Sequence, residues 1–338
     1  MALSPRIPLF ARWLLALVLL GLAIRLVVSD PELGRRLLST PLWVVGGVGA
    51  LVAFNQVLMS LRLSLSVEYA GAPKISEFVW FRLTSVGQFL NLFGPLGNVY
   101  RAVVLKREHG VSYTSYASAL FAFVWLDTLM AFLIAFVVIA VLEPGLALFG
   151  YPALLVLFVV MSGAALAPVV ALALVRRFGG LVPARFSERL VKLFATAGGA
   201  LRHPRFVLRF LTINLVTTVV HASALWLGFF AVGGHVGAPG LVLFQVFVRA
   251  SNLIQITPGN VGINELAYGL LAHASHGSVE QGVSVALLNR TIGTLTTIAL
   301  GVAFGGGSLL LDQRTIRQAK ASLALDTEAA PADKPLEK

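Results

Sequence analysis

The chain has 338 residues, of which 57% are hydrophobic and 12% are charged, with a mean hydropathy of +0.86. A soluble domain carries about 25% charged residues. The composition therefore excludes a soluble domain and predicts an all-α polytopic membrane protein. The net charge of +11 lies in loops between apolar runs, which favours membrane lipids and not nucleic acid as the partner, and the lack of cysteine excludes disulfides and thiolate chemistry.

Six apolar runs are each long enough to cross about 30 Å of hydrocarbon. In chain order they cover residues 8–28, 42–62, 113–142, 151–175, 207–232 and 283–311. No small-residue cleavage site follows the first run, so we interpret it as a retained span and not as a signal peptide.

Two further apolar regions, about 78–105 and 241–272, are interrupted by Pro and Gly. The interruptions lie within residues 91–101 and 255–265, and an ionisable residue follows each one, Arg101 in the first and Glu265 in the second. Irregular backbone persists at membrane depth only where it is buried in protein or lines a cavity. A pair of such breaks, one in each half, is the best sequence indication of a transport or binding site.

Loop charge predicts the topology. Residues 176–209 contain eight Lys or Arg against one Glu, so this segment, both termini and the basic pair at 106–107 are expected on the cytoplasmic side. The loops at 143–150 and 233–240 carry one charge between them and are expected outside. Six full transmembrane helices plus two re-entrant helical hairpins satisfy all of these assignments. The alternative, full crossing of both broken regions, would put the basic pair outside.

This topology divides the chain into two halves of opposite orientation, 8–142 and 151–311, each with two spans, a broken hairpin and a third span. Such an inverted repeat is the architecture of many secondary transporters. Residues 1–312 are therefore expected to form one membrane domain, with a basic cytoplasmic loop at 176–206. Residues 313–338 are rich in Ala, Pro and charge, which predicts a disordered cytoplasmic tail with no appended catalytic domain.

Charged residues within apolar runs are costly and are candidates for function. Asp127 lies in the middle of a run, where a carboxylate needs a cation or a proton, and we expect Arg101 or Arg290 to supply the charge. The alternative is a buried ion pair that only fixes helix packing. Arg62 lies near a predicted span end, so we expect it to reach the interface, as we do Arg12 and Arg25. For Arg82 both interpretations stay open.

Polar residues beside the breaks complete the candidate site. The helices that begin after the breaks, near Asn98 and Asn264, could present N-terminal N–H groups to a phosphate. Close helix packing is the alternative explanation for the glycines. Asn214 and His221 lie seven residues apart on one face, which favours a polar contact between helices. The candidate headgroup contacts are Asn91, Pro95, Gly97, Asn98, Arg101, Asp127, Arg249, Asn252, Pro258, Gly259, Asn260, Gly262, Glu265 and Arg290.

The sequence offers no pattern for a metal or a nucleotide. Its six His are scattered without a neighbouring Asp or Glu at ligand spacing, and it has no Walker-type loop. We therefore expect no metal, no cofactor and no ATP drive.

Several of these segments together resemble a known family. They are Asn91 with Pro95, Gly97 and Arg101; residues 106–112; Asp127; Pro258-Gly259 with Gly262 and Glu265; and Arg290. Over about residues 10–312 the chain resembles the membrane domain of bacterial lysylphosphatidylglycerol synthases, a flippase-like family. It departs from the family pattern at Asn98, where Glu is frequent, and at Phe123-Val124, where Glu-Arg is frequent.

The resemblance implies a lipid-handling protein of the bacterial inner membrane. In the synthases this domain is associated with moving aminoacylated phospholipid across the bilayer, and the synthase activity lies in a separate cytosolic domain, so we expect no enzyme here. We expect a flippase or transporter for a lipid with an anionic or phosphate-bearing headgroup. The alternatives are a non-transporting, lipid-binding accessory subunit of an envelope-biogenesis enzyme and, more remotely, a membrane-embedded transferase.

Overall fold

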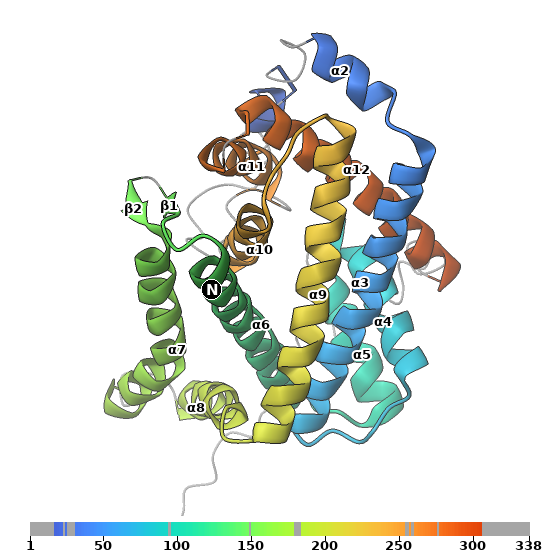
Figure 1. The fold of residues 1–338 in the computed structure, drawn as a ribbon. Helices are drawn as coiled ribbons and strands as arrows, with labels where there is room; N and C mark the ends of the chain where they lie inside the picture. The colour runs from blue at the N-terminus through green and yellow to red at the C-terminus, as the bar shows by residue number, and fades with distance from the viewer. Residues whose placement is uncertain are drawn as a thin grey trace, which may run out of the picture.

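The computed structural model describes residues 17–305 except 23, 26–30, 94–95, 149, 179–183, 254–256, 258–259 and 276. The described chain is almost entirely helical (Figure 1). Its helices are α2 (Pro31–Leu38), α3 (Leu42–Tyr69), α4 (Glu77–Asn91), α5 (Leu96–His109), α6 (Tyr113–Leu142), α7 (Ala153–Phe178), α8 (Ala184–Ala200), α9 (Pro204–Ala231), α10 (Ala238–Leu253), α11 (Ile263–Ala274) and α12 (Val279–Ala303). The exception to the all-α prediction is a minimal antiparallel pair, β1 (Ala147–Leu148) and β2 (Tyr151–Pro152).

Five described helices, α3, α6, α7, α9 and α12, are long and apolar enough to cross a membrane. They correspond to five of the six predicted runs, which confirms a polytopic α-helical membrane protein. The first predicted run, 8–28, lies largely outside the described residues, although residues 17–22 and 24–25 are helical. The predicted tail at 313–338 also lies outside them.

The predicted end of the second span, at residue 62, was wrong because α3 continues to Tyr69. Serines on both sides of Arg62 have their hydroxyl groups bonded to the helix's own carbonyl oxygens: Ser60 Oγ donates to Val57 O at 2.7 Å, and Ser66 Oγ, in the added segment, donates to Arg62 O at 2.9 Å. Such bonds let serine continue a helix inside a low-dielectric environment. Arg62 therefore lies within a helix that continues past it, and not at a span end.

The two broken regions form pairs of short helices. At 1.5 Å per residue, α4 and α5 are about 22 Å long, and α10 and α11 about 24 and 18 Å, so none alone crosses about 30 Å of hydrocarbon. Within each pair the two helices contact one another. Figure 1 shows α4 and α5 towards the end of the molecule where α3 finishes, and α11 towards the end where α3 begins.

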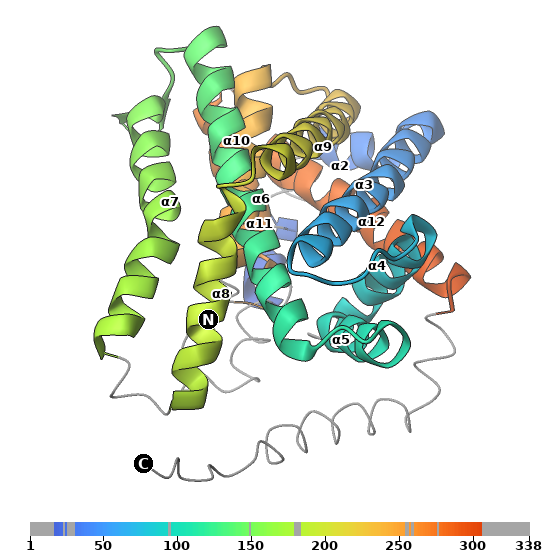
Figure 2. The same cartoon turned by 90° about the horizontal axis from the view of Figure 1, so that it is seen from below.

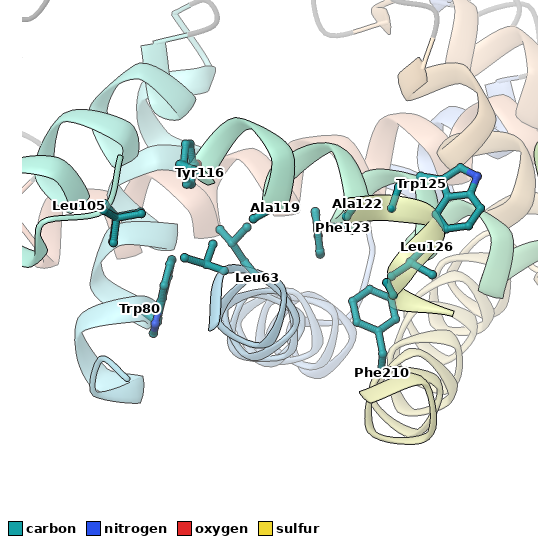
Figure 3. Packing of buried hydrophobic residues seen from close by; sticks show 14 of the residues in the cluster. Leu63, Trp80, Leu105, Tyr116, Ala119, Ala122, Phe123, Trp125, Leu126 and Phe210 are labelled. Atoms are coloured by element: carbon teal, nitrogen blue, oxygen red, sulfur yellow. The ribbon is translucent and has the colours of Figure 1, made fainter. Parts of the chain in front are cut away.

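The long helices α6 and α12 pack against a central pair, α3 and α9. The α4–α5 pair contacts α12 through α4, the α10–α11 pair contacts α6 through α10, and α7 and α8 lie beside α6 (Figure 2). The largest buried apolar cluster joins α3, α4, α5, α6, α8 and α9, with Leu63, Trp80 and Phe210 among its members (Figure 3). Because lipid is as apolar as these side chains, close packing rather than water exclusion stabilises such contacts.

One tryptophan attaches α7 to α6. Pro168 lies inside α7 and has no backbone N–H, so the carbonyl of Ala164 lacks its usual helical partner. The indole Nε1–H of Trp125 on α6 donates to that carbonyl oxygen at 2.7 Å. The proline thus frees an acceptor, and the tryptophan on the neighbouring helix satisfies it.

Candidate functional site

Four polar side chains from four helices, one of them a carboxylate, meet in one cluster. Arg62 of α3 and Arg249 of α10 both form ion pairs with Asp127 of α6. The amide oxygen of Asn214 on α9 accepts hydrogen bonds from the Nη1 atoms of both arginines, each at 3.2 Å. Arg249 also donates to the backbone oxygen of Asp127 at 3.1 Å. We call Arg62, Asp127, Asn214 and Arg249 the Asp127 cluster.

The Asp127 cluster lies deep in the helix assembly. Asp127 is fourteen residues, or about 21 Å, from the start of α6, and Asn214 is about 15 Å from the start of α9. Only 4% of the Arg62 side chain and 9% of the Arg249 side chain are exposed, against 18% of Asp127. Two expectations were therefore wrong: Arg62 does not reach the interface, and Asp127 pairs with Arg62 and Arg249 instead of Arg101 or Arg290.

A second charged site surrounds Glu265, which is completely buried in the first turn of α11. Its carboxylate forms an ion pair with Arg290 of α12 and accepts a hydrogen bond from the backbone N–H of Gly262 at 2.7 Å. Gly262, with φ of +82°, is the residue that caps α11. Arg290 also donates to the carbonyl oxygen of Asn260 at 3.4 Å. One carboxylate therefore caps the helix after the break and balances the charge of Arg290.

The Glu265–Arg290 pair lines a cavity of about 290 Å³, which we call the Glu265 cavity. Its wall is formed by α3, α9, α10, α11 and α12 and is mostly apolar. Asn55, His221, Asn264, Tyr268 and Asn289 supply the other polar groups. Within the described residues, the amide oxygen of Asn55 and both polar side-chain atoms of Asn289 are buried without a hydrogen-bond partner. Buried polar groups normally have partners, so these unsatisfied atoms favour a polar ligand or water in the cavity.

A third site surrounds Arg101, which is almost fully buried in the α4–α5 pair. Its guanidinium donates to the carbonyl oxygens of Leu83 at 3.3 Å and Thr84 at 3.4 Å, and to the side-chain oxygen of Asn98 at 3.0 Å. No described carboxylate forms an ion pair with it. Arg101 therefore holds α5 against α4 through neutral acceptors, and it lines neither the Glu265 cavity nor the Asp127 cluster.

Gly97 has a steric role in the α4–α5 pair. A Cβ on Gly97 would overlap the carbonyl oxygen of Gly87, so only glycine allows α5 to approach α4 this closely. Close packing, the alternative explanation for Gly97, is therefore present in the structure.

The helix N-termini after both breaks already carry caps from the chain itself. Asn91 accepts from the Gly97 N–H at 2.9 Å, as Glu265 does from Gly262. Asn264 instead accepts from the Ser251 hydroxyl at 3.0 Å, and the amide of Asn260 donates to the Ser251 carbonyl at 2.9 Å. A phosphate at either N-terminus would have to compete with these side chains.

The predicted candidates thus fall into three groups instead of one. The structure brings Asp127 and Arg249 together; Glu265, Arg290, Asn260 and Gly262 together; and Asn91, Gly97, Asn98 and Arg101 together. Outside the described residues lie Pro95, Pro258, Gly259 and the side chain of Asn252. Arg82 is exposed at the surface, 4.0 Å from Glu108.

Sequence reasoning missed Arg62, Asn55 and Asn289, but a spacing signal was present for the first two. Asn55 and Arg62 lie seven residues apart on α3, as Asn214 and His221 do on α9. A separation of seven puts two residues on one helix face. The central helices α3 and α9 each contribute one of these residues to the Asp127 cluster and one to the Glu265 cavity. The expected contact of Asn214 with other helices is confirmed.

The long apolar helices, the two interrupted segments and the buried ion pairs define a polytopic membrane protein. Residues 13–301 match the family model described as the lysylphosphatidylglycerol synthase TM region, and the chain belongs to this family. Family and fold together indicate a membrane protein of lipid metabolism or transport. No curated protein and no solved structure matches the chain.

Proposed function

We propose that the protein is a flippase or transporter that moves a phospholipid, or another lipid with a polar headgroup, across the bacterial inner membrane. The observation that carries this proposal is the Glu265 cavity, in which an ion pair at membrane depth lies beside an interrupted helix. Ionisable groups at such a depth are expensive and mark substrate or ion pathways. Interrupted helices contribute substrate sites in many transporters.

The size and chemistry of the cavity suit a headgroup. Small-molecule sites usually measure about 300–1,000 Å³, so the volume of about 290 Å³ accommodates a small polar group and leaves the acyl chains in the surrounding lipid. Arg290 would receive the phosphate, replacing part of its contact with Glu265. Asn55 and Asn289, whose side-chain atoms have no described partner, would bond to the remaining headgroup oxygens.

The packing of α4 and α10 supports an inverted repeat, an arrangement found in many secondary transporters. The central helices α3 and α9 occupy equivalent positions in the two halves, and each is preceded by a shorter helix, α2 or α8. Helix α4 packs on α12, the last helix of the second half, and α10 packs on α6, the last helix of the first, while α11 packs on α12 of its own half. This reciprocal exchange is expected if the two halves are related by a pseudo-two-fold axis, with both broken pairs re-entrant.

The loop charges suggest how the protein is oriented. The basic residues from Arg176 to Arg209 lie at the end of α7, along α8 and at the start of α9. By the excess of positive charge on cytoplasmic loops, this end would face the cytoplasm, as would both termini.

The direct test is lipid translocation by the purified protein in liposomes. Fluorescent lipids of several headgroup classes are placed in the inner leaflet or in both leaflets, and their exposure to a membrane-impermeant quencher is followed over time, with and without an ion gradient. We expect faster translocation than in protein-free liposomes for at least one phosphate-bearing lipid. Rates equal to those of empty liposomes for every class would contradict transport and favour a non-transporting, lipid-binding subunit.

A further inference from the structure

The two arginines of the Asp127 cluster carry more positive charge than its one carboxylate neutralises. Arg62 and Arg249 carry two positive charges, and Asp127 supplies one negative charge, which leaves +1 at the centre of the helix assembly. Among the described residues no second carboxylate lies within ion-pairing distance of either arginine. A buried charge without a counterion is costly, so this cluster would be stabilised by one additional anion.

The two arginines also have N–H groups that make no hydrogen bond within the described structure. Arg62 uses Nε for the Leu58 carbonyl oxygen and Nη1 for Asp127 and Asn214, and in the described structure Nη2 makes no hydrogen bond. Arg249 makes its hydrogen bonds and its ion pair through Nη1, which leaves Nε and Nη2 without a described partner. Guanidinium N–H groups in this number match the several acceptor oxygens of a phosphate.

The Asp127 cluster is also adjacent to the Glu265 cavity. Val248 lines the cavity, and the next residue on α10 is Arg249. On α9, His221 lines the cavity and Asn214 belongs to the cluster, a separation of about 10 Å along the helix. Asp127 itself remains 18% exposed, so the carboxylate is not closed off from a ligand.

We propose that Arg62 and Arg249 form a second anion site, which takes the singly charged phosphodiester of a lipid headgroup. This assignment rests on the proposed function, because a lipid headgroup that dissociates from Arg290 would bind next at Arg62 and Arg249. Asp127 competes with the phosphodiester as an internal anion. It neutralises one arginine while the site is empty, and some of its ion-pair contacts with the arginines are replaced when the phosphodiester binds.

Binding to the purified full-length protein in detergent tests this assignment. The shift of the thermal unfolding temperature is measured against the concentration of phosphatidylglycerol, which carries one negative charge, of net-neutral phosphatidylcholine, and of inorganic phosphate. The variants are Arg249→Gln, which lowers the charge of the cluster to zero, and Asp127→Asn, which raises it to +2. Arg82→Gln and Glu108→Gln make the same charge changes at an exposed pair and serve as matched controls.

We expect wild-type protein to prefer phosphatidylglycerol over phosphatidylcholine. Arg249→Gln should weaken phosphatidylglycerol binding about tenfold or more, and Asp127→Asn should tighten it severalfold, since removing the internal anion favours the external one. A gain of affinity in Asp127→Asn cannot arise from misfolding. Equal loss of binding in both variants, or no difference between the two lipids, would overturn the proposal. Inorganic phosphate binding as tightly as phosphatidylglycerol would overturn the assignment to a lipid.

The two proposals can fail separately. An effect of Arg290→Gln on binding, with none from Arg249→Gln or Asp127→Asn, would reject the second site and leave the Glu265 cavity intact. The expected effects at Asp127 and Arg249, together with no translocation in liposomes, would instead reject transport and retain the anion site.

Discussion

Glu265, at the start of α11, pairs with Arg290 of α12 while its other oxygen caps the helix that begins after the break. The same carboxylate therefore has a structural and an electrostatic role. Removing each role separately distinguishes them, because glutamine can still accept the bond from Gly262 but cannot neutralise Arg290.

We predict that Glu265→Gln destabilises the protein less than Glu265→Ala. The alanine variant leaves both a buried arginine without its carboxylate and a helix without its cap, for a loss of about 3–5 kcal/mol. The measurement is thermal or denaturant unfolding in detergent, followed by circular dichroism. Equal unfolding temperatures for the two variants would show that the cap contributes nothing.

Arg101 is expected to stabilise the α4–α5 pair and not to contact the substrate in this state. Arg101→Ala leaves the carbonyl oxygens of Leu83 and Thr84 without these donors and should cost about 2–4 kcal/mol. Arg101→Lys, which can still reach part of this set, should cost less. If Arg101→Ala retains wild-type stability but loses transport, Arg101 acts on the lipid, contrary to this prediction.

Gly97→Ala should separate α5 from α4, because the added methyl group would overlap the Gly87 carbonyl oxygen. We expect a destabilisation of about 1–3 kcal/mol, the usual range for overpacking. Gly46→Ala is the matched control, since a Cβ there meets no atom within 4 Å. Unfolding temperatures of the two variants give the comparison, and an equally small effect in both would contradict the close approach of the two helices.

Trp125→Phe should loosen α7 from α6. The substitution keeps an aromatic ring but removes the donor to the Ala164 oxygen, which Pro168 leaves without a helical partner, at a cost of about 1–2 kcal/mol. Trp226→Phe, at a tryptophan whose side chain is half exposed, is the control. Hydrogen exchange in α7 should rise only in the first variant; unchanged exchange would show that the bond does not hold α7.

The sequence predicted the long helices and the breaks, but it did not predict α8, which lies in the segment expected as a basic loop, or the pairing of charges. Apolar length alone identifies α6 and α9, and Pro with Gly identifies the ends of α4 and α10. The partners of Asp127 depend on how α3 and α10 are rotated about their axes and where they cross α6, which residue spacing along one helix does not specify. Arg62 was misjudged for a different reason: serine hydroxyls bonded to the backbone allow α3 to continue through a polar segment.

The central claim is that Arg290 in the Glu265 cavity contacts the headgroup during translocation. Its most direct test is the liposome assay with wild type, Arg290→Gln and the exposed control Arg82→Gln, at equal reconstituted amounts of folded protein. We predict that Arg290→Gln slows translocation of a phosphate-bearing lipid at least about tenfold, as expected for the loss of a charge-assisted hydrogen bond, while Arg82→Gln keeps the wild-type rate. Wild-type rates in a folded Arg290→Gln protein would contradict the claim.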